Sequence, residues 1–282
     1  MKNNTFYSTE TAWCPGCGNF AILETLVSVL NSLKKEPREI LLVGGIGQAA
    51  KLNQYVNANG FSGLHGRALP AAVAAKIANE SLTVIVNTGD GDSYGEGGNH
   101  FLHNIRRNAD ITHFVHNNQI YGLTKGQPSP TSAACSDLPS AACNINSPLN
   151  PLLLALAAGA TFVARSFSGN EAHLARIMKA AVAHKGYALV DILQPCISFN
   201  KVNTFAYYNE RVYELEKDYK PSNREKAMQR CTEWGKKIPI GIFYQAKAPT
   251  FHERRPEIFN GTPLVDQAAK AGELPKLLKT FL

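Results

Sequence analysis

Short β-branched runs alternate along the chain with longer amphipathic runs that are rich in alanine. The first kind of run predicts strands and the second predicts helices. Strands are expected over residues 39–43, 82–87, 111–116, 160–165 and 187–193. Helices are expected over residues 18–33, 66–79, 97–107, 151–158 and 170–184. Near-continuous apolar strands separated by helices predict a doubly wound α/β domain, a parallel sheet covered on both faces.

This alternating pattern ends near residue 200. Residues 14–200 contain all the expected strands, and we expect them to form one domain with a CxxC segment at its start. The remainder, 201–282, begins with a charged helical segment, continues through "IPIGIFYQ" and ends in a polar tail. We expect this C-terminal extension to pack on the domain or on a partner subunit.

Charge and composition narrow the class of protein. The net charge is +7, but the lysines and arginines are scattered and form no basic stripe interleaved with aromatics, so no nucleic-acid partner is expected. The longest apolar stretch, 151–164, is too short to span a bilayer, so no membrane association is expected either. Six irregularly spaced cysteines do not suggest a disulfide framework. Free, catalytic or metal-bound cysteines and a polar N-terminus lead us to expect a cytoplasmic protein.

Polar groups follow two neighbouring strands of the pattern. Gly89-Asp90-Gly91 follows the strand 82–87, and Asn117-Asn118 follows the strand 111–116. The gap of about 25 residues holds one crossover helix, so both groups should emerge at the carboxyl ends of adjacent parallel strands, where open α/β sheets bind ligands. Asp90 and Asn118 supply hard oxygen ligands, which suit Mg²⁺ bound together with a diphosphate.

At this point a family resemblance becomes clear. GDG, a helix-length gap and NN resemble the diphosphate-binding motif of thiamine diphosphate enzymes. More widely, the chain resembles the β subunit of 2-oxoacid:ferredoxin oxidoreductases, closest to the 2-oxoglutarate and broad 2-oxoacid branch. The motifs are "WCPGCGN", "GGIG", "LHGRALP", "GDGD", "NNQIYGLTKGQPSPT" and "QPCISFN", in order from residue 13 to about 200. The resemblance implies oxidative decarboxylation of a 2-oxoacid, 2-oxoglutarate first, to an acyl-CoA, with electrons passed to ferredoxin.

The resemblance also implies which residues form the site. Mg²⁺ would be bound by Asp90, by the side chain of Asn118 and by the backbone carbonyl of Ile120. The thiamine diphosphate would be surrounded by Ile46, Gly47, Gln48, Ala49, His65, Gly91, Asp92, Gly122 and Leu123. The catalytic residues would be His65, Lys51 and Lys125, the two lysines as point charges near the substrate. For each lysine the alternative is a solvated surface position.

Cysteines raise a separate question. The family's [4Fe–4S] cluster uses four thiolates, and Cys14, Cys17 and Cys196 match three of those positions. Gln48 stands at the fourth. Three thiolates with one open iron predict a labile cluster, while a structural zinc site needs four ligands, and a metal-free site remains an alternative.

One half of a thiamine enzyme's active site is missing from this chain. The glutamate that activates the cofactor lies on a pyrimidine-binding domain, and residues 201–282 are too few to form one. The resemblance therefore implies a heterodimer with an α subunit, and ferredoxin, a 2-oxoacid and coenzyme A as further partners. Two other classes stay open: a non-redox thiamine diphosphate-dependent decarboxylase or carboligase subunit without a cluster, and a non-catalytic metal-binding protein built on CxxC.

Overall fold

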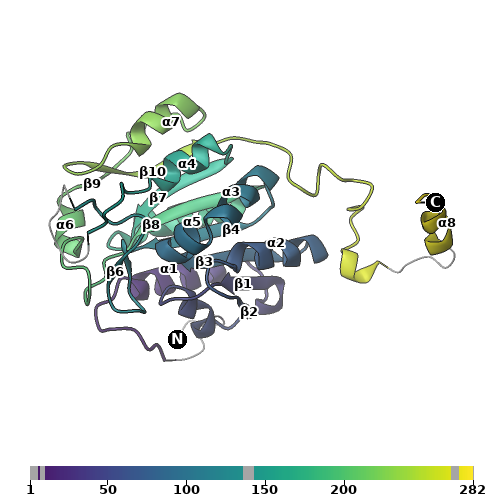
Figure 1. The fold of residues 1–282 in the computed structure, drawn as a ribbon, viewed down its shortest axis with the longest axis horizontal. Helices are drawn as coiled ribbons and strands as arrows, with labels where there is room; N and C mark the ends of the chain where they lie inside the picture. Colours follow the sequence, from purple (N-terminus) through teal and green to yellow (C-terminus); the bar gives the residue numbers. More distant parts are fainter. Residues whose placement is uncertain (1–5, 7–9, 136–142, 268–272, 282) are drawn as a thin grey trace.

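Eight strands form one central sheet in the computed structural model, which describes residues 6, 10–135, 143–267 and 273–281 (Figure 1). The order across the sheet is β2-β1-β3-β4-β8-β7-β10-β9. Their bounds are β1 Ile40–Gly44, β2 Asn59–Ser62, β3 Thr83–Gly89, β4 Thr112–Asn117, β7 Phe162–Phe167, β8 Ala188–Leu193, β9 Val212–Glu214 and β10 Ile238–Gln245. β5 (Ile120–Tyr121) and β6 (Gln127–Pro128) form a separate antiparallel hairpin. The doubly wound α/β prediction is confirmed.

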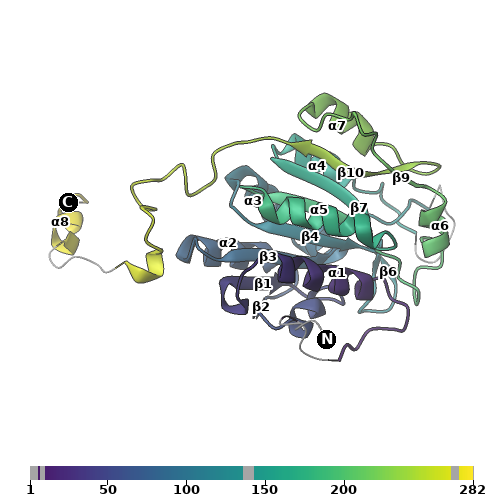
Figure 2. The ribbon, with the colours of Figure 1, turned by 180° about the vertical axis from the view of Figure 1, so that it is seen from behind.

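Helices cover both faces of this sheet. α2 (Ala68–Ala78), α3 (Gly98–Arg107) and α4 (Pro151–Ala157) lie on the face seen in Figure 1. α1 (Asn19–Ser32) and α5 (Glu171–Ala183) lie on the opposite face, seen in Figure 2. Neighbouring residues on a strand point to opposite faces, so Leu42 packs under α1 and α5 while Val43 packs under the other layer. Two separate apolar cores result, which explains why the strands read as continuous hydrophobic runs.

Beyond residue 200 the chain adds two strands to the same sheet. β10 pairs antiparallel with β7, and β9 pairs parallel with β10. α6 (Phe205–Asn209) and α7 (Arg224–Cys231) accompany these strands, and the side chain of Phe243 on β10 is fully buried. Up to residue 245 the extension therefore packs on the domain, and a boundary at residue 200 stays a prediction.

Irregular segments complete the described chain. Short 3₁₀ helices cover Pro37–Glu39, Ala50–Tyr55 and Leu264–Asp266, and a π-helical turn covers Gly91–Glu96. After β10 the chain leaves the sheet and ends in α8 (Glu273–Lys279), which lies away from the body in Figures 1 and 2. None of the helices formed by the described residues is long and apolar enough to cross a lipid bilayer.

Cysteine usage differs from the expectation at one place. Cys135 and Cys143 form a disulfide, so the prediction of free, catalytic or metal-bound cysteines is wrong for this pair. The two cysteines are eight positions apart, and this spacing does not by itself indicate that they are bonded. Cys14, Cys17, Cys196 and Cys231 are free.

Strand pairing places the two polar motifs together. β3 and β4 are parallel neighbours, and Gly89 at the end of β3 pairs with His116 near the end of β4. Asp90 and Asn117 therefore leave the sheet side by side at its carboxyl edge, as the spacing predicts.

Candidate active site

Asp90 is an almost fully buried acidic residue at this edge, 1% exposed. Its Oδ2 accepts a hydrogen bond from Ser129 Oγ at 2.5 Å and lies 2.6 Å from Thr131 Oγ1. Burial raises the pKa of Asp90 to about 6, while the two hydroxyl groups act in the opposite direction. The carboxylate is thus poorly compensated by the protein alone, which favours a cation beside it.

Ser129 and Thr131 have no predicted role in the sequence, although they lie in the quoted "QPSPT" motif. Thr131 Oγ1 also lies 2.9 Å from Asn117 Oδ1. A hydroxyl has one proton, so Thr131 can donate to only one of its two acceptors at a time. A pair of hydroxyl residues directly after a hairpin is the signal that could have indicated support for the carboxylate.

Asn118 and Ile120 begin the hairpin that follows β4. The side-chain oxygen of Asn118 accepts a hydrogen bond from Ile120 N at 3.1 Å, and the carbonyl of Asn118 accepts one from Asn200 Nδ2 at 3.0 Å. This turn places an amide oxygen and a backbone carbonyl on the same sheet edge as Asp90. Among the described residues no three His, Cys, Asp or Glu side chains could hold a metal ion together. A hard cation here needs amide and carbonyl oxygens, as Mg²⁺ accepts, and oxygens of its ligand.

Gly91 lies directly against the ring of Tyr121. A Cβ at this position would lie 2.2 Å from the ring of Tyr121, so only glycine allows the chain to pass here. The Tyr121 hydroxyl donates to the Glu96 carboxylate at 3.1 Å. Gly122 and Leu123 continue the hairpin, and Leu123 is exposed.

Asp92 ties two loops to the end of β3. Its Oδ1 accepts hydrogen bonds from Gly66 N at 2.7 Å and Ile46 N at 3.3 Å, and lies 2.6 Å from His65 Nδ1. Burial raises the pKa of Asp92 above its ordinary value, and these donors oppose the rise. Glycine is required at position 45, because a Cβ there would lie 2.2 Å from Asp92 Oδ2.

His65 lies between two carboxylates. Besides its contact with Asp92, its Nε2 lies 3.4 Å from Glu96 Oε2. The imidazole is also edge-on to the Tyr121 ring at 6.1 Å between centroids. The structure therefore fixes His65 at the mouth of the site.

The predicted lysines and the 46–49 loop lie at the same edge. Ile46 is exposed, Gly47 has a left-handed φ of 125° and Ala49 is buried. Lys51 is partly exposed and Lys125 is exposed on the β5–β6 hairpin, and no ion pair joins either lysine to a described residue. Their roles toward a substrate stay predictions.

The three predicted cysteine ligands converge with Gln48. Gly18 N donates to the carbonyl of Pro195 at 3.4 Å, which brings the CxxC turn beside Cys196. Burial raises the pKa of Cys17 to about 11, and the nearby thiols of Cys196 and Cys14 raise it further. Cys17 is therefore a neutral thiol near pH 7, and no three His, Cys, Asp or Glu side chains of the described residues, these cysteines included, are grouped closely enough to hold a metal ion.

Gln48 joins this corner from the neighbouring loop. Its backbone carbonyl accepts a hydrogen bond from Trp13 Nε1 at 2.9 Å, directly before Cys14. Its side-chain Oε1 is buried and has no hydrogen-bond partner. The corner thus offers three thiols and one neutral amide, a set that lacks the fourth thiolate of a [4Fe–4S] site.

The chain is similar in sequence to known proteins. Residues 45–192 match the family model "Thiamine pyrophosphate enzyme, C-terminal TPP binding domain". Residues 196–260 match the model for the C-terminal part of the pyruvate ferredoxin oxidoreductase beta subunit. The 2-oxoacid:ferredoxin oxidoreductase subunit beta of Saccharolobus solfataricus is 46% identical over 259 residues, which cover 86% of this chain and 84% of the relative. The 2-oxoglutarate synthase subunit KorB of Methanocaldococcus jannaschii is 32% identical over 243 residues, covering 86% and 90%.

A solved structure agrees with these relatives. It is a 2-oxoglutarate:ferredoxin oxidoreductase from Magnetococcus marinus with 2-oxoglutarate, coenzyme A and succinyl-CoA bound. The TM-score is 0.90 at 34% sequence identity, over 99% of this chain and 96% of the matched chain. Fold and site together define a thiamine pyrophosphate enzyme, represented here by its diphosphate-binding domain. More specifically, the chain belongs to the β subunits of the 2-oxoacid:ferredoxin oxidoreductases.

The raised pKa of Asp90 predicts a pH-dependent cost in the cofactor-free protein. The pKa of Asp90 in the folded state, about 6, exceeds the ordinary value of 3.8. The contribution of Asp90 to the free energy of unfolding is therefore most favourable below pH 4, and it is lost as the pH rises through 6. We expect Asp90→Asn to raise the free energy of unfolding at pH 8 by up to about 3 kcal/mol, and to change it little at pH 4. Urea unfolding at both pH values measures this, with the exposed Asp218→Asn as control. A loss of stability at pH 8 would contradict it.

Proposed function

We propose that this β subunit binds Mg²⁺ and thiamine diphosphate and, with an α subunit, oxidatively decarboxylates a 2-oxoacid to an acyl-CoA while reducing ferredoxin. The buried carboxylate of Asp90 carries the proposal, because it is poorly compensated without a cation and lies at the same sheet edge as Asn118 and Ile120. These three groups would hold Mg²⁺. When bound, thiamine diphosphate supplies the electron sink for decarboxylation.

The protein's own residues would position this cofactor. Gly91 and Gly122 let the backbone approach the diphosphate, and Asp92 holds the Ile46 and His65 loops against it. The short contact between Asp92 and His65 orients the imidazole at the mouth of the site. We propose that His65, which the resemblance implies lies beside the cofactor, donates a hydrogen bond toward the cofactor or substrate.

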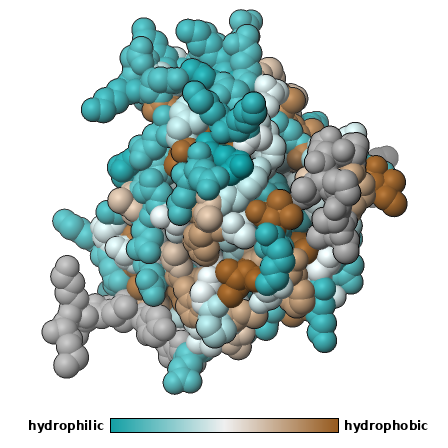
Figure 3. Space-filling model, turned by 90° about the vertical axis from the view of Figure 1, so that its left-hand side faces the viewer, coloured by the Kyte–Doolittle hydropathy of each residue, from teal (hydrophilic) through white to brown (hydrophobic). Residues whose placement is uncertain are grey.

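An α subunit is the partner that fits the site's rim. Apolar side chains from four separate loops are exposed around the carboxyl edge: Ile46, Leu64, Leu123, Ile197 and Phe199. Figure 3 shows this face, where brown apolar side chains interrupt a hydrophilic surface. Exposed apolar side chains grouped around a site are typical of a surface that a partner covers. The reaction's use of coenzyme A and ferredoxin supports a cytoplasmic location.

We propose 2-oxoglutarate as the substrate. Lys125 and Lys51 are cations with no ion-pair partner among the described residues, at the edge where the substrate must enter. A second carboxylate on the substrate would complement them. The Magnetococcus structure, which has 2-oxoglutarate bound, supports this choice.

The thiol corner fits a cluster only in part. Cys14, Cys17 and Cys196 would hold three corners of a [4Fe–4S] cluster, and the amide of Gln48 would stand at the fourth. When bound, a cluster supplies one-electron transfer. Gln48 also supports a second candidate function, a non-redox thiamine diphosphate-dependent decarboxylase or carboligase subunit, because an amide is a poor ligand for such a cluster.

The function is tested with the chain purified alone and with its α subunit. We expect coenzyme A-dependent reduction of ferredoxin by 2-oxoglutarate only with the complex, because the group that activates the cofactor would come from the α subunit. Asp90→Ala in the complex should abolish Mg²⁺-dependent thiamine diphosphate binding, measured by calorimetry, without dissociating the subunits. Turnover by the single chain, or unchanged cofactor affinity in Asp90→Ala, would refute the proposal.

Lys125→Met tests the choice of substrate. Loss of a charge-assisted contact costs about 1.5–3 kcal/mol, so the KM for 2-oxoglutarate should rise about tenfold or more while that for pyruvate changes little. Lys179→Met, an exposed position on α5, serves as the control. An equal rise for both substrates would show that Lys125 does not contact the distal carboxylate.

Gln48→Cys tests the thiol corner. Wild-type complex made under strict anaerobiosis should contain iron and sulfide that are lost quickly in air, and Gln48→Cys should slow that loss by completing the thiolate set. Chemical iron and sulfide assays during air exposure measure both. A wild-type complex that contains no iron would exclude the cluster and favour the non-redox function. An unchanged rate of iron and sulfide loss in Gln48→Cys would show that another group fills the fourth position.

A further inference from the structure

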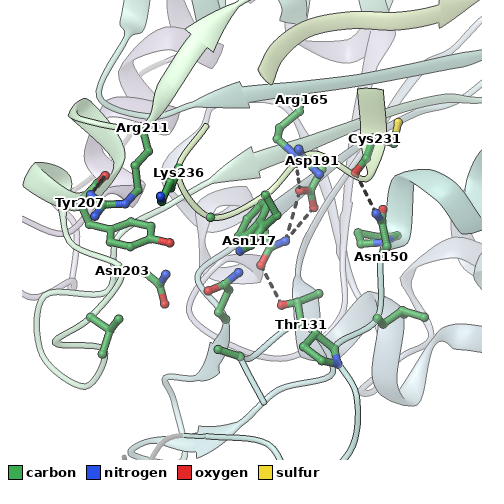
Figure 4. Close-up of a pocket in the computed structure, with 18 residues that line it drawn as sticks. Asn117, Thr131, Asn150, Arg165, Asp191, Asn203, Tyr207, Arg211, Cys231 and Lys236 are labelled. Carbon is green, nitrogen blue, oxygen red and sulfur yellow. Dashed lines mark hydrogen bonds and ion pairs between the residues drawn. The ribbon is translucent and has the colours of Figure 1, made fainter. Parts of the chain in front are cut away.

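A cavity of about 630 Å³ lies beside the proposed cofactor site and is separated from it by Asn117 and Thr131. Figure 4 shows Arg165 and Asp191 above this cavity, Asn117 and Thr131 below them, and Tyr207, Arg211 and Lys236 on the left. A volume of this size accommodates a small organic molecule. Neither the metal ligands nor the thiol corner borders it.

Arg165 is the unusual group in this cavity. Its side chain is 3% exposed, and Nε and Nη1 have no hydrogen-bond partner. The guanidinium lies over the rings of Trp234 and Phe243, 5.1 and 5.6 Å from their centroids, which fix its position. Its only carboxylate neighbour among the described residues, Asp191, is 3.7 Å away. A buried guanidinium with unused donors is costly unless an acceptor reaches it.

Asp191 compensates Arg165 incompletely because other groups share its oxygens. Asn117 Nδ2 donates to both carboxylate oxygens at 3.1 and 3.2 Å, and the Tyr94 hydroxyl donates to Oδ1 at 2.9 Å. The carboxylate is therefore held toward Asn117 and Tyr94. The remaining donors of Arg165 are left for a ligand.

The rest of the lining favours an anion with two charged ends. Arg211 and Lys236 line the side away from Arg165, so three cations border the cavity against the single carboxylate of Asp191 (Figure 4). Arg211 stacks on Tyr207, with 4.2 Å between its Cζ and the ring centroid, and its Nη1 is paired with the exposed Glu210 at 2.8 Å; these contacts hold it at the rim, where Lys236 is the cation without an ion pair among the described residues. Lys236 forms no ion pair with a described residue.

We propose that this cavity binds a small organic dianion, one end on Arg165 and the other on Arg211 and Lys236. Dicarboxylates and phosphate monoesters share this chemistry, since both present oxyanions that a guanidinium recognises. The site is separate from the thiamine diphosphate site. Because its groups are preformed, binding should not require the cofactor.

Calorimetric titration of the purified α–β complex without Mg²⁺ and thiamine diphosphate tests this site. Succinate and glycerol 3-phosphate are the two probes, and neutral succinamide is the uncharged control. We expect saturable binding of at least one dianion and none of succinamide. The dianion that binds more tightly shows whether the site prefers a dicarboxylate or a phosphate monoester. Since no cofactor is present, failure of the proposed function would leave this result unaffected. Absence of saturable binding by both dianions would refute the site.

Variants at the exposed rim locate the bound dianion. Arg211→Gln combined with Lys236→Gln should weaken its affinity about tenfold or more, because two charge-assisted contacts are lost. Lys237→Gln is the matched control: it removes an equal charge next to Lys236, on a side chain outside the lining. Unfolding temperatures of all variants show whether the fold is intact. Wild-type affinity in the double variant, or an equal loss in Lys237→Gln, would overturn the proposal.

Discussion

The burial of Asp90 at the end of β3 is the constraint around which the carboxyl edge is organised. A carboxylate in this position loses its hydration, and the two nearby hydroxyls return only part of that free energy. A bound divalent cation would remove the cost and would lower the pKa that burial raises. With a cation bound, the same residue would stabilise the fold that it destabilises in the cation-free protein, so stability of the cation-free fold alone would not favour an aspartate here.

Two carboxylates of the GDGD motif have different roles because their donors differ. Asp90 faces hydroxyl groups, which rotate and can yield to a metal ion, whereas Asp92 faces backbone N–H groups of two loops, which cannot. One carboxylate is available to a ligand and the other is committed to the scaffold. Two glycines are required by these contacts. Gly45 must lack a side chain so that Asp92 can reach its donors, and Gly91 must lack one so that the chain can pass the ring of Tyr121.

Much of the fold and part of the candidate site could be predicted from the sequence, because both leave a regular pattern along the chain. Apolar strands and amphipathic helices show the sheet and its layers, and the GDG-to-NN spacing places two motifs on adjacent strand ends. β10 could not be predicted as a member of the sheet because it runs antiparallel and follows a charged helix, so no βαβ unit indicates it. The importance of Ser129, Thr131, Asp191 and Arg165 comes from burial and contact, and single letters in a strand or loop carry no sign of either.

Asn117 connects the two halves of the carboxyl edge. Its Nδ2 donates to Asp191 while its Oδ1 lies near Thr131, whose hydroxyl can turn either to Asn117 or to Asp90. A metal ion that neutralises Asp90 would make that oxygen a weaker acceptor and leave the Thr131 proton to Asn117. Such a shift would polarise the Asn117 amide toward Asp191 and, through it, change the field at Arg165. If the two proposed ligands are coupled along this path, the coupling must act equally in both directions, so a dianion at Arg165 would change the affinity for the cation by the same factor as the cation changes that of the dianion.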